Sequence, residues 1–232
     1  MFCAVWVLCC WWQLWLFYAL SFPRNADQYD IVLLGDSVLA NQPSMGGDKV
    51  HHYLQKELGG EVFEGAFGGS SMANRDYESL SFCVTEWSMV NLSKMICDKD
   101  FRSAKAAMSY AYQYRYNNRQ VFEGYKDKME GLSEIDFSKV EVLIIEHGTN
   151  DYNSGVRLDN ERDLYDEDTF GGGLRSVLKR LRETYPDLRI VLVTPAYCEV
   201  GGVHSSDDKD WGGGYLYQYV EKEIEIARHE EK

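Results

Sequence analysis

Four short runs rich in apolar residues recur along the chain, separated by longer segments of mixed composition. They cover residues 31–34, 61–63, 140–145 and 190–193, and each is bounded by glycine or polar residues. A continuous apolar run of this length is typical of a strand that is covered on both faces, as in a parallel sheet. We therefore predict four buried strands.

The segments between these runs carry helical patterns. A short helix is expected at 49–58, with Gly59 and Gly60 as its stop signal. Two amphipathic helices are predicted by apolar residues at helical spacing: Leu174, Val177, Leu178, Leu181 and Tyr185, and then Leu216, Tyr219, Val220, Ile224 and Ala227. The first of them should stop at Pro186. Residues 72–139 are expected to hold two or three helices.

A run of alternating tyrosines lies within that long helical region. Tyr110, Tyr112, Tyr114 and Tyr116 have the period of a strand, although the neighbouring residues 104–108 are good helix formers. We favour a helix here. The tyrosines then either pack against the loops or line a surface for a sugar.

Strands that alternate with helices predict a doubly wound parallel sheet in a flavodoxin-like three-layer α/β/α arrangement. No linker rich in proline, glycine or serine interrupts residues 29–232, so we expect one domain there. In sheets of this kind, ligands bind at the carboxyl ends of the strands.

Residues 1–22 form an apolar segment without a formal charge. It is interpreted as a membrane anchor, a cleaved signal or a buried helix. The first two interpretations make the rest of the chain extracytoplasmic, membrane-anchored or secreted. Arg24 follows the segment, and the positive-inside rule would instead place the domain in the cytoplasm.

Charge and cysteine content narrow the range of partners. The net charge of −13 argues against binding a nucleic acid through a basic patch, and favours uncharged substrates. Three of the six cysteines lie in the apolar segment. Of the others, Cys83 and Cys97 could pair in an oxidising compartment, but buried free thiols are the more usual outcome for an odd count. No cysteine spacing indicates a metal, and no cofactor is expected.

Small and polar residues follow three of the predicted strands. They are Gly35-Asp36-Ser37, the glycine-rich loop 65–71, and Gly148-Thr149-Asn150-Asp151. A serine just after a buried strand is held rigidly, and glycine N–H groups and an asparagine amide can stabilise the oxyanion of acyl transfer. Taken one at a time, these residues could equally be a turn serine, a loop glycine and an asparagine of an Asx-turn.

These three blocks together resemble the SGNH, or GDSL, hydrolases. LGDS at 34–37 resembles the family's first block, GGSS at 68–71 its glycine block, and GTND at 148–151 its third block. The resemblance extends over about residues 30–230. It implies that Ser37 is the nucleophile and that its own N–H, the N–H of Gly69 and the Asn150 side chain form the oxyanion hole.

Gly68 is the alternative to Gly69 as the glycine whose backbone N–H contributes to the oxyanion hole. Aligning Glu64 with the position where the family usually has asparagine favours Gly69.

The general base is where this sequence departs from the family pattern, which places a D-x-x-H pair after a fifth strand. Gly202-Val203-His204 imitates the end of such a motif, but Gly201 stands where aspartate is required. His204 is therefore an unlikely base, and His147 is a weaker candidate. His51, His52 and His229 are read as surface residues. We expect the fifth strand and the base beyond Lys232.

The leading hypothesis is a serine ester hydrolase that cleaves an acyl ester through an acyl-Ser37 intermediate. An O-acetyl group on a carbohydrate is the substrate that the family's range suggests. One alternative is a catalytically degenerate member of the family that binds a glycan. Another is a metal-dependent phosphatase using Asp36 and Asp151. The glycine loop fits neither common nucleotide-binding pattern.

Overall fold

The computed structural model describes residues 28–40, 49–74, 86–107, 119–197, 199–200 and 204–230. The apolar segment 1–22 and the tyrosines of 110–116 lie outside the described residues, so their interpretations stay predictions. Within the described ranges, no helix is both long and apolar enough to span a bilayer. Cys97 carries a free, half-buried thiol, which is the outcome favoured from the sequence.

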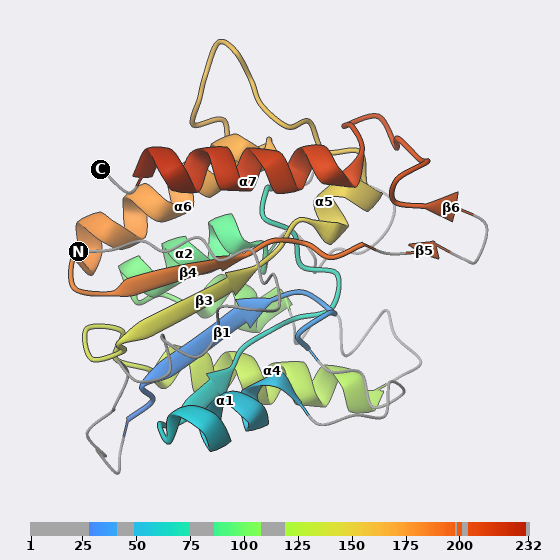
Figure 1. Cartoon of the computed structure of the whole chain (residues 1–232). Coiled ribbons are helices and arrows are strands. Elements are labelled where there is room, and N and C mark those ends of the chain that lie inside the picture. Colours follow the sequence, from blue (N-terminus) through green and yellow to red (C-terminus); the bar gives the residue numbers. More distant parts are fainter. Residues whose placement is uncertain are drawn as a thin grey trace.

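The centre of the molecule is a parallel sheet of four strands. Their order is β2-β1-β3-β4. The strands are β1 (Ile31–Gly35), β2 (Val62–Glu64), β3 (Val142–Glu146) and β4 (Arg189–Val193), all pairing in parallel. The four predicted strands are thus confirmed with shifts of one or two residues at their ends (Figure 1).

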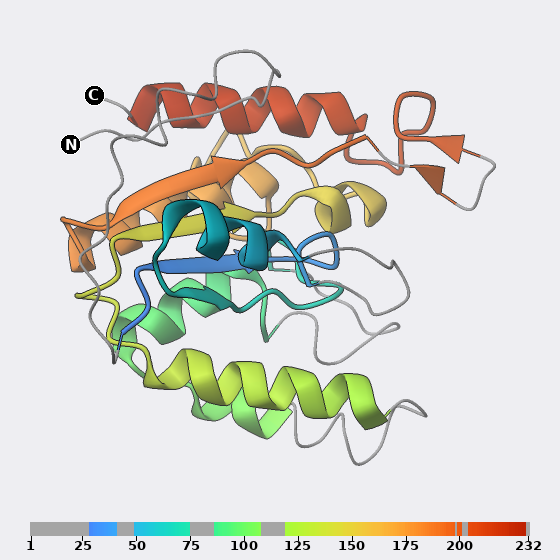
Figure 2. The same ribbon diagram turned by 60° about the horizontal axis from the view of Figure 1, so that its bottom comes forward.

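Helices cover both faces of this sheet. They are α1 (Val50–Leu58), α2 (Met89–Asp98), α4 (Arg119–Glu134), α5 (Thr149–Asn153), α6 (Phe170–Thr184) and α7 (Leu216–Glu230), with a further helical turn at 102–107. One apolar cluster joins the sheet to α2, α4, α6 and α7, and a smaller cluster joins its other face to α1. In Figure 2, α1 accordingly crosses in front of the sheet while α2 lies behind it. The three-layer prediction is confirmed.

Helix α6 begins four residues before the first apolar position that predicted it. The Thr169 side chain accepts a hydrogen bond from the Gly172 N–H and so caps the helix. A Cβ on Gly172 would lie 2.2 Å from the Asp166 carbonyl oxygen, so the close approach of that loop requires glycine. The sequence pattern did not predict the first turn of the helix, because the run Gly171-Gly172-Gly173 has a low helix propensity.

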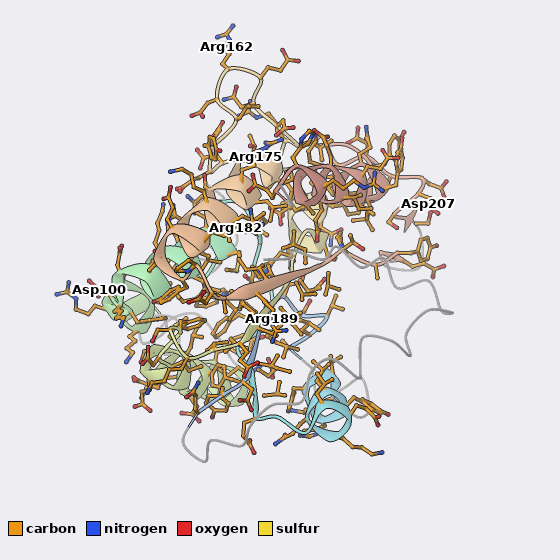
Figure 3. All side chains as sticks on the ribbon, turned by 60° about the vertical axis from the view of Figure 1, so that its left-hand side comes forward. Asp100, Arg162, Arg175, Arg182, Arg189 and Asp207 are labelled. Atoms are coloured by element: carbon orange, nitrogen blue, oxygen red, sulfur yellow. The ribbon has the colours of Figure 1, made fainter. Side chains whose placement is uncertain are left out.

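Ion pairs connect α6 and β4 to their neighbours. Arg182 of α6 pairs with Glu230 of α7, and Arg175 of α6 pairs with Asp159 at 2.6 Å. Arg189, the first residue of β4, pairs with Glu141 at 3.0 Å. Figure 3 shows these arginines, with Arg162 at the tip of the loop before α6, Asp207 after the hairpin and Asp100 on the opposite side.

The segment between β4 and α7 holds a small antiparallel hairpin that the sequence pattern did not predict. It consists of β5 (Glu199–Val200) and β6 (His204–Ser205). In Figure 1, the hairpin and α5 lie at the edge of the sheet to which the strands point. This edge is where the sequence predicted the functional residues.

Candidate active site

The turn that follows β1 carries Ser37. The Ala40 N–H donates to the Asp36 carbonyl oxygen at 2.9 Å, and the Val38 N–H donates to the Asp36 carboxyl at 2.8 Å. Asp36 is fully buried, whereas Ser37 is half-buried. A Cβ on Gly35 would lie 2.8 Å from Leu39 Cδ1, so a glycine lets the turn fold back on its strand. These contacts fix the backbone on both sides of the serine.

The glycine loop runs beside this turn. The N–H groups of Gly65 and Phe67 donate to the carbonyl oxygens of Leu33 and Gly35, at 2.8 and 2.9 Å. Gly69 has a φ of +78°, in the left-handed region that favours glycine.

One hydrogen bond engages Gly68, the alternative to Gly69 in the oxyanion role. The Gly68 N–H donates to the Tyr125 hydroxyl at 2.8 Å. This bond ties the glycine loop to α4, and the preference for Gly69 continues to rest on the sequence alignment.

Helix α4 supports the loop through a second contact, with Glu64. The Glu64 carboxyl accepts hydrogen bonds from the Ala66 N–H at 3.0 Å and from Lys128 Nζ at 2.6 Å. Lys128 also donates to the Ala66 carbonyl oxygen at 3.1 Å. Burial lowers the pKa of Lys128, which the adjacent Glu64 carboxylate partly offsets. At this position, where the SGNH family usually has asparagine, the chain carries half of a partly buried ion pair.

The Asn150 amide links the other two candidate residues. Its Nδ2 donates to the Asp36 carboxyl at 3.1 Å and to the Ser70 carbonyl oxygen at 2.8 Å. Asp36 precedes Ser37 and Ser70 follows Gly69, so the amide joins the segments that carry these two predicted residues. A side-chain amide has two N–H donors, and here each has an acceptor within the protein. An oxyanion would have to displace one of them, and the bond to Asp36 is the longer.

Asp151 has a structural position. Its carboxyl accepts the N–H groups of Met72 and Ala73 at 2.8 and 3.0 Å, and its side chain is fully buried. It therefore fixes the chain that leaves the glycine loop. Across the described part of the chain, no group of three or more histidine, cysteine, aspartate or glutamate side chains is arranged to hold a metal ion. The phosphatase alternative thus lacks a ligand set in those residues.

The histidines differ in their burial. His147 is buried, its Nε2 lies 2.9 Å from the Ser70 hydroxyl, and burial lowers its pKa to about 3. His52 and His229 are exposed, and His51 packs edge-on against His52 on α1. His204 opens β6, but its side chain is outside the described residues. Within the ranges given above, no histidine hydrogen-bonds to the Ser37 hydroxyl.

One acidic residue at this edge was not singled out from the sequence. Glu146 ends β3, pairs in register with Gly35 and is 2% exposed. Burial raises the pKa of Glu146, and the neighbouring Asp36 charge raises it further. Burial raises the pKa of Asp36 as well. A glutamate that ends an otherwise apolar strand is the signal that could have identified it.

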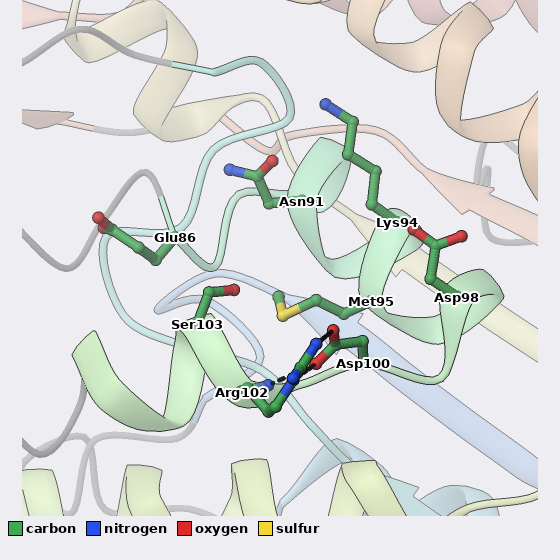
Figure 4. Close-up of a pocket in the computed structure, with 8 residues that line it drawn as sticks. All are labelled: Glu86, Asn91, Lys94, Met95, Asp98, Asp100, Arg102 and Ser103. Carbon is green, nitrogen blue, oxygen red and sulfur yellow. Dashed lines mark hydrogen bonds and ion pairs between the residues drawn. The ribbon is translucent and has the colours of Figure 1, made fainter.

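A cavity of about 730 Å³ lies elsewhere, beside α2 and the helical turn at 102–107. It is lined by Glu86, Asn91, Lys94, Met95, Asp98, Asp100, Arg102 and Ser103 (Figure 4). Arg102 is paired with Asp100 at 2.5 Å there. None of the three candidate residues contributes to this cavity.

Comparison with known proteins supports the fold. No protein-family model matches the chain, and no curated protein matches its sequence. A solved structure from Lactobacillus plantarum is 18% identical with a TM-score of 0.52, covering 87% of this chain and 74% of that one. A structure described as a possible lipase from Chitinophaga pinensis is 15% identical with a TM-score of 0.52, covering 88% of this chain and 65% of that one. At identities this low, the structural match shows a shared fold alone. That fold is the three-layer arrangement expected from the SGNH resemblance.

Proposed function

We propose that the protein is a serine ester hydrolase of the SGNH type with Ser37 as its nucleophile. One observation carries the proposal: the Asn150 amide donates to Asp36 and to Ser70, the residues that adjoin Ser37 and Gly69. The segments that carry the nucleophile and the backbone donor are therefore joined by the side-chain donor. This combination suits the tetrahedral intermediate of acyl transfer.

The proposed reaction has two steps. The Ser37 oxygen attacks the ester carbonyl carbon while its proton passes to a base, and the oxyanion receives the N–H groups of Ser37 and Gly69 and the Asn150 amide. The carbon–oxygen bond to the alcohol then breaks, and the alcohol leaves with a proton. Water releases the acid from acyl-Ser37. The base belongs to a D-x-x-H segment that the resemblance implies, outside the described residues.

The proposed substrate is an uncharged ester, because a chain of net charge −13 repels anions. An O-acetyl group on a carbohydrate is the candidate within that class, and its support is the resemblance alone. The proposed location is extracytoplasmic, and its support is the apolar segment 1–22.

Acylation of Ser37 by p-nitrophenyl acetate tests the proposal. Each protein is assayed with and without imidazole, which can act as an external base, and the acetyl group is located by peptide mass spectrometry. We expect nitrophenol release above the imidazole blank and an acetyl group on Ser37. Ser37→Ala should abolish both, and Ser138→Ala, at an exposed serine, should retain both.

Two outcomes would contradict the proposal. Equal nitrophenol release by the wild type and Ser37→Ala would refute Ser37 as the nucleophile. Saturable binding of an acetylated glycan without any acetyl transfer would instead support the glycan-binding alternative.

A further inference from the structure

Glu146 occupies an unusual position for a carboxyl group. It is the last residue of β3, it is 2% exposed, and it lies beside the start of the Ser37 turn through its pairing with Gly35. Among the described residues, neither of its carboxyl oxygens has a partner at good hydrogen-bond geometry, and only the Asp36 main chain acts on it as a donor. An ionised carboxylate in such a place would be desolvated with little compensation.

The groups around Glu146 are acidic rather than basic. Asp36 is its neighbour, and Asp151 and Glu223 act on the pair from α5 and α7. Over the described ranges, no lysine, arginine or histidine forms an ion pair with Glu146 or Asp36. Two adjacent buried carboxyl groups without a cation cannot both be ionised at neutral pH, so the pair retains a proton.

Hydrogen bonds decide which carboxyl keeps that proton. Asp36 accepts the Val38 N–H and the Asn150 amide, and both bonds favour its ionised form. Glu146 has only the Asp36 main chain acting in that direction, and its burial and the Asp36 charge outweigh it, so the proton belongs on Glu146. A protonated Glu146 becomes a donor, and Asp36 is the acceptor beside it.

We propose that Glu146 is a positioning residue: its protonated carboxyl donates a hydrogen bond to Asp36 and thereby holds the Ser37 turn and the Asn150 amide in place. The proposal rests on the proposed function, since it assigns a role in the same site. Asp36 is the connecting group, because its carboxyl contacts the turn on one side and Asn150 on the other.

The pair gives the site a dependence on pH. Burial and the Asp36 charge raise the pKa of Glu146 above its ordinary value of 4.5. Loss of the shared proton at alkaline pH would place two negative charges side by side next to the Ser37 turn. The native state binds this proton more tightly than the unfolded chain does, so the stabilisation is complete below pH 4.5 and is lost as the pH rises through the raised pKa.

Infrared spectroscopy tests the protonation state without reference to any reaction. We expect the wild-type protein to show, at pH 7, a C=O band of a protonated carboxyl that Glu146→Gln removes. Glu223 is a second buried carboxyl, with a pKa raised to about 8 by burial, so the band is assigned from the difference between the two proteins. Glu221→Gln, at an exposed residue of the same helix as Glu223, should leave the spectrum unchanged.

The positioning role is tested by Ser37 acylation in two variants. We expect the acylation rate of the wild type to fall at alkaline pH, as Glu146 loses its proton. Glu146→Gln keeps a donor to Asp36 without a titratable proton, so it should retain the wild-type rate at pH 7 and show no such fall. Glu146→Ala removes the donor and should lower the rate about 10²-fold, as expected for a displaced nucleophile.

Equal loss in both Glu146 variants, or a carboxyl band unaffected by Glu146→Gln, would overturn the proposal. Absence of acylation in the wild type, with the Glu146 band present, would refute the role of Ser37 and leave the shared proton established.

Discussion

The Ser70 hydroxyl and the Nε2 atom of His147 lie 2.9 Å apart in the protein interior. The Ser70 hydroxyl donates its own hydrogen to the Trp87 carbonyl oxygen at 2.8 Å, so the hydrogen shared with His147 comes from the imidazole. His147 is thereby a neutral donor that connects the end of β3 to the glycine loop. This contact with Ser70 argues against His147, a weak candidate from the sequence, as the base for Ser37.

Acid should destabilise the protein through His147. Its pKa is lowered to about 3 by burial, so its contribution to stability is present above pH 6.5 and is lost as the pH falls toward 3. We expect His147→Gln to reduce the loss of unfolding free energy between pH 7 and pH 4.5, measured by urea denaturation. His229→Gln, at an exposed histidine of α7, serves as the control and should follow the wild type.

Asn150→Ala should reduce the rate of Ser37 acylation by about 10²–10³-fold, the usual effect of removing an oxyanion donor. The variant also loses the bonds to Asp36 and Ser70, so the melting temperature is measured alongside the rate. Asn153→Ala, at an exposed position of the same helix, should change neither quantity. An unchanged rate in Asn150→Ala would remove the amide from the proposed oxyanion hole.

Lys128→Met should destabilise the fold by about 1–3 kcal/mol, because it leaves the largely buried Glu64 carboxylate without its cation. Glu64→Gln should restore part of that loss when it is combined with Lys128→Met, because the uncompensated charge disappears. The four unfolding free energies of this double-mutant cycle give the coupling energy. Additive effects would show that the pair contributes little to holding the loop.

Gly148→Ala should destabilise the protein by about 1–3 kcal/mol. The glycine has a φ of +128°, and a Cβ there would lie 3.0 Å from Pro195 Cγ. Gly124→Ala provides the opposite case, because Gly124 lies on an exposed part of α4 with nothing within 4 Å of an added Cβ. Alanine there should stabilise the helix by about 0.5–1 kcal/mol. Denaturant midpoints of the two variants should therefore move in opposite directions.

The predicted parts of the fold are those with a strong local signal. The strands were visible as apolar runs, and α1 ends at Leu58, where the predicted stop residue Gly59 caps it with a φ of +73°. The five residues of α5 were missed because threonine, asparagine and aspartate favour turns, and this helix forms where Asn150 and Asp151 bond to other segments. The β5–β6 hairpin was missed because two-residue strands have no readable period.

The candidate site was predictable only where its residues occur in motifs. The motif blocks contain Ser37, Gly69 and Asn150, and the parallel sheet explains why they meet. Tyr125 and Lys128 support the loop from a helix more than 50 residues away, and no local pattern in α4 indicates this. Their contribution depends on tertiary packing, which sequence periodicity does not encode.

The double use of the Asn150 amide has a consequence for how tightly the site could hold a reaction intermediate. An oxyanion would be competing with Asp36 for a hydrogen that is already bonded, so the net gain is the difference between two acceptors rather than a full hydrogen bond. A boronate that mimics the intermediate would measure that difference directly. Weakening Asp36 as an acceptor should then increase boronate affinity, an effect opposite to that of deleting an ordinary ligand contact.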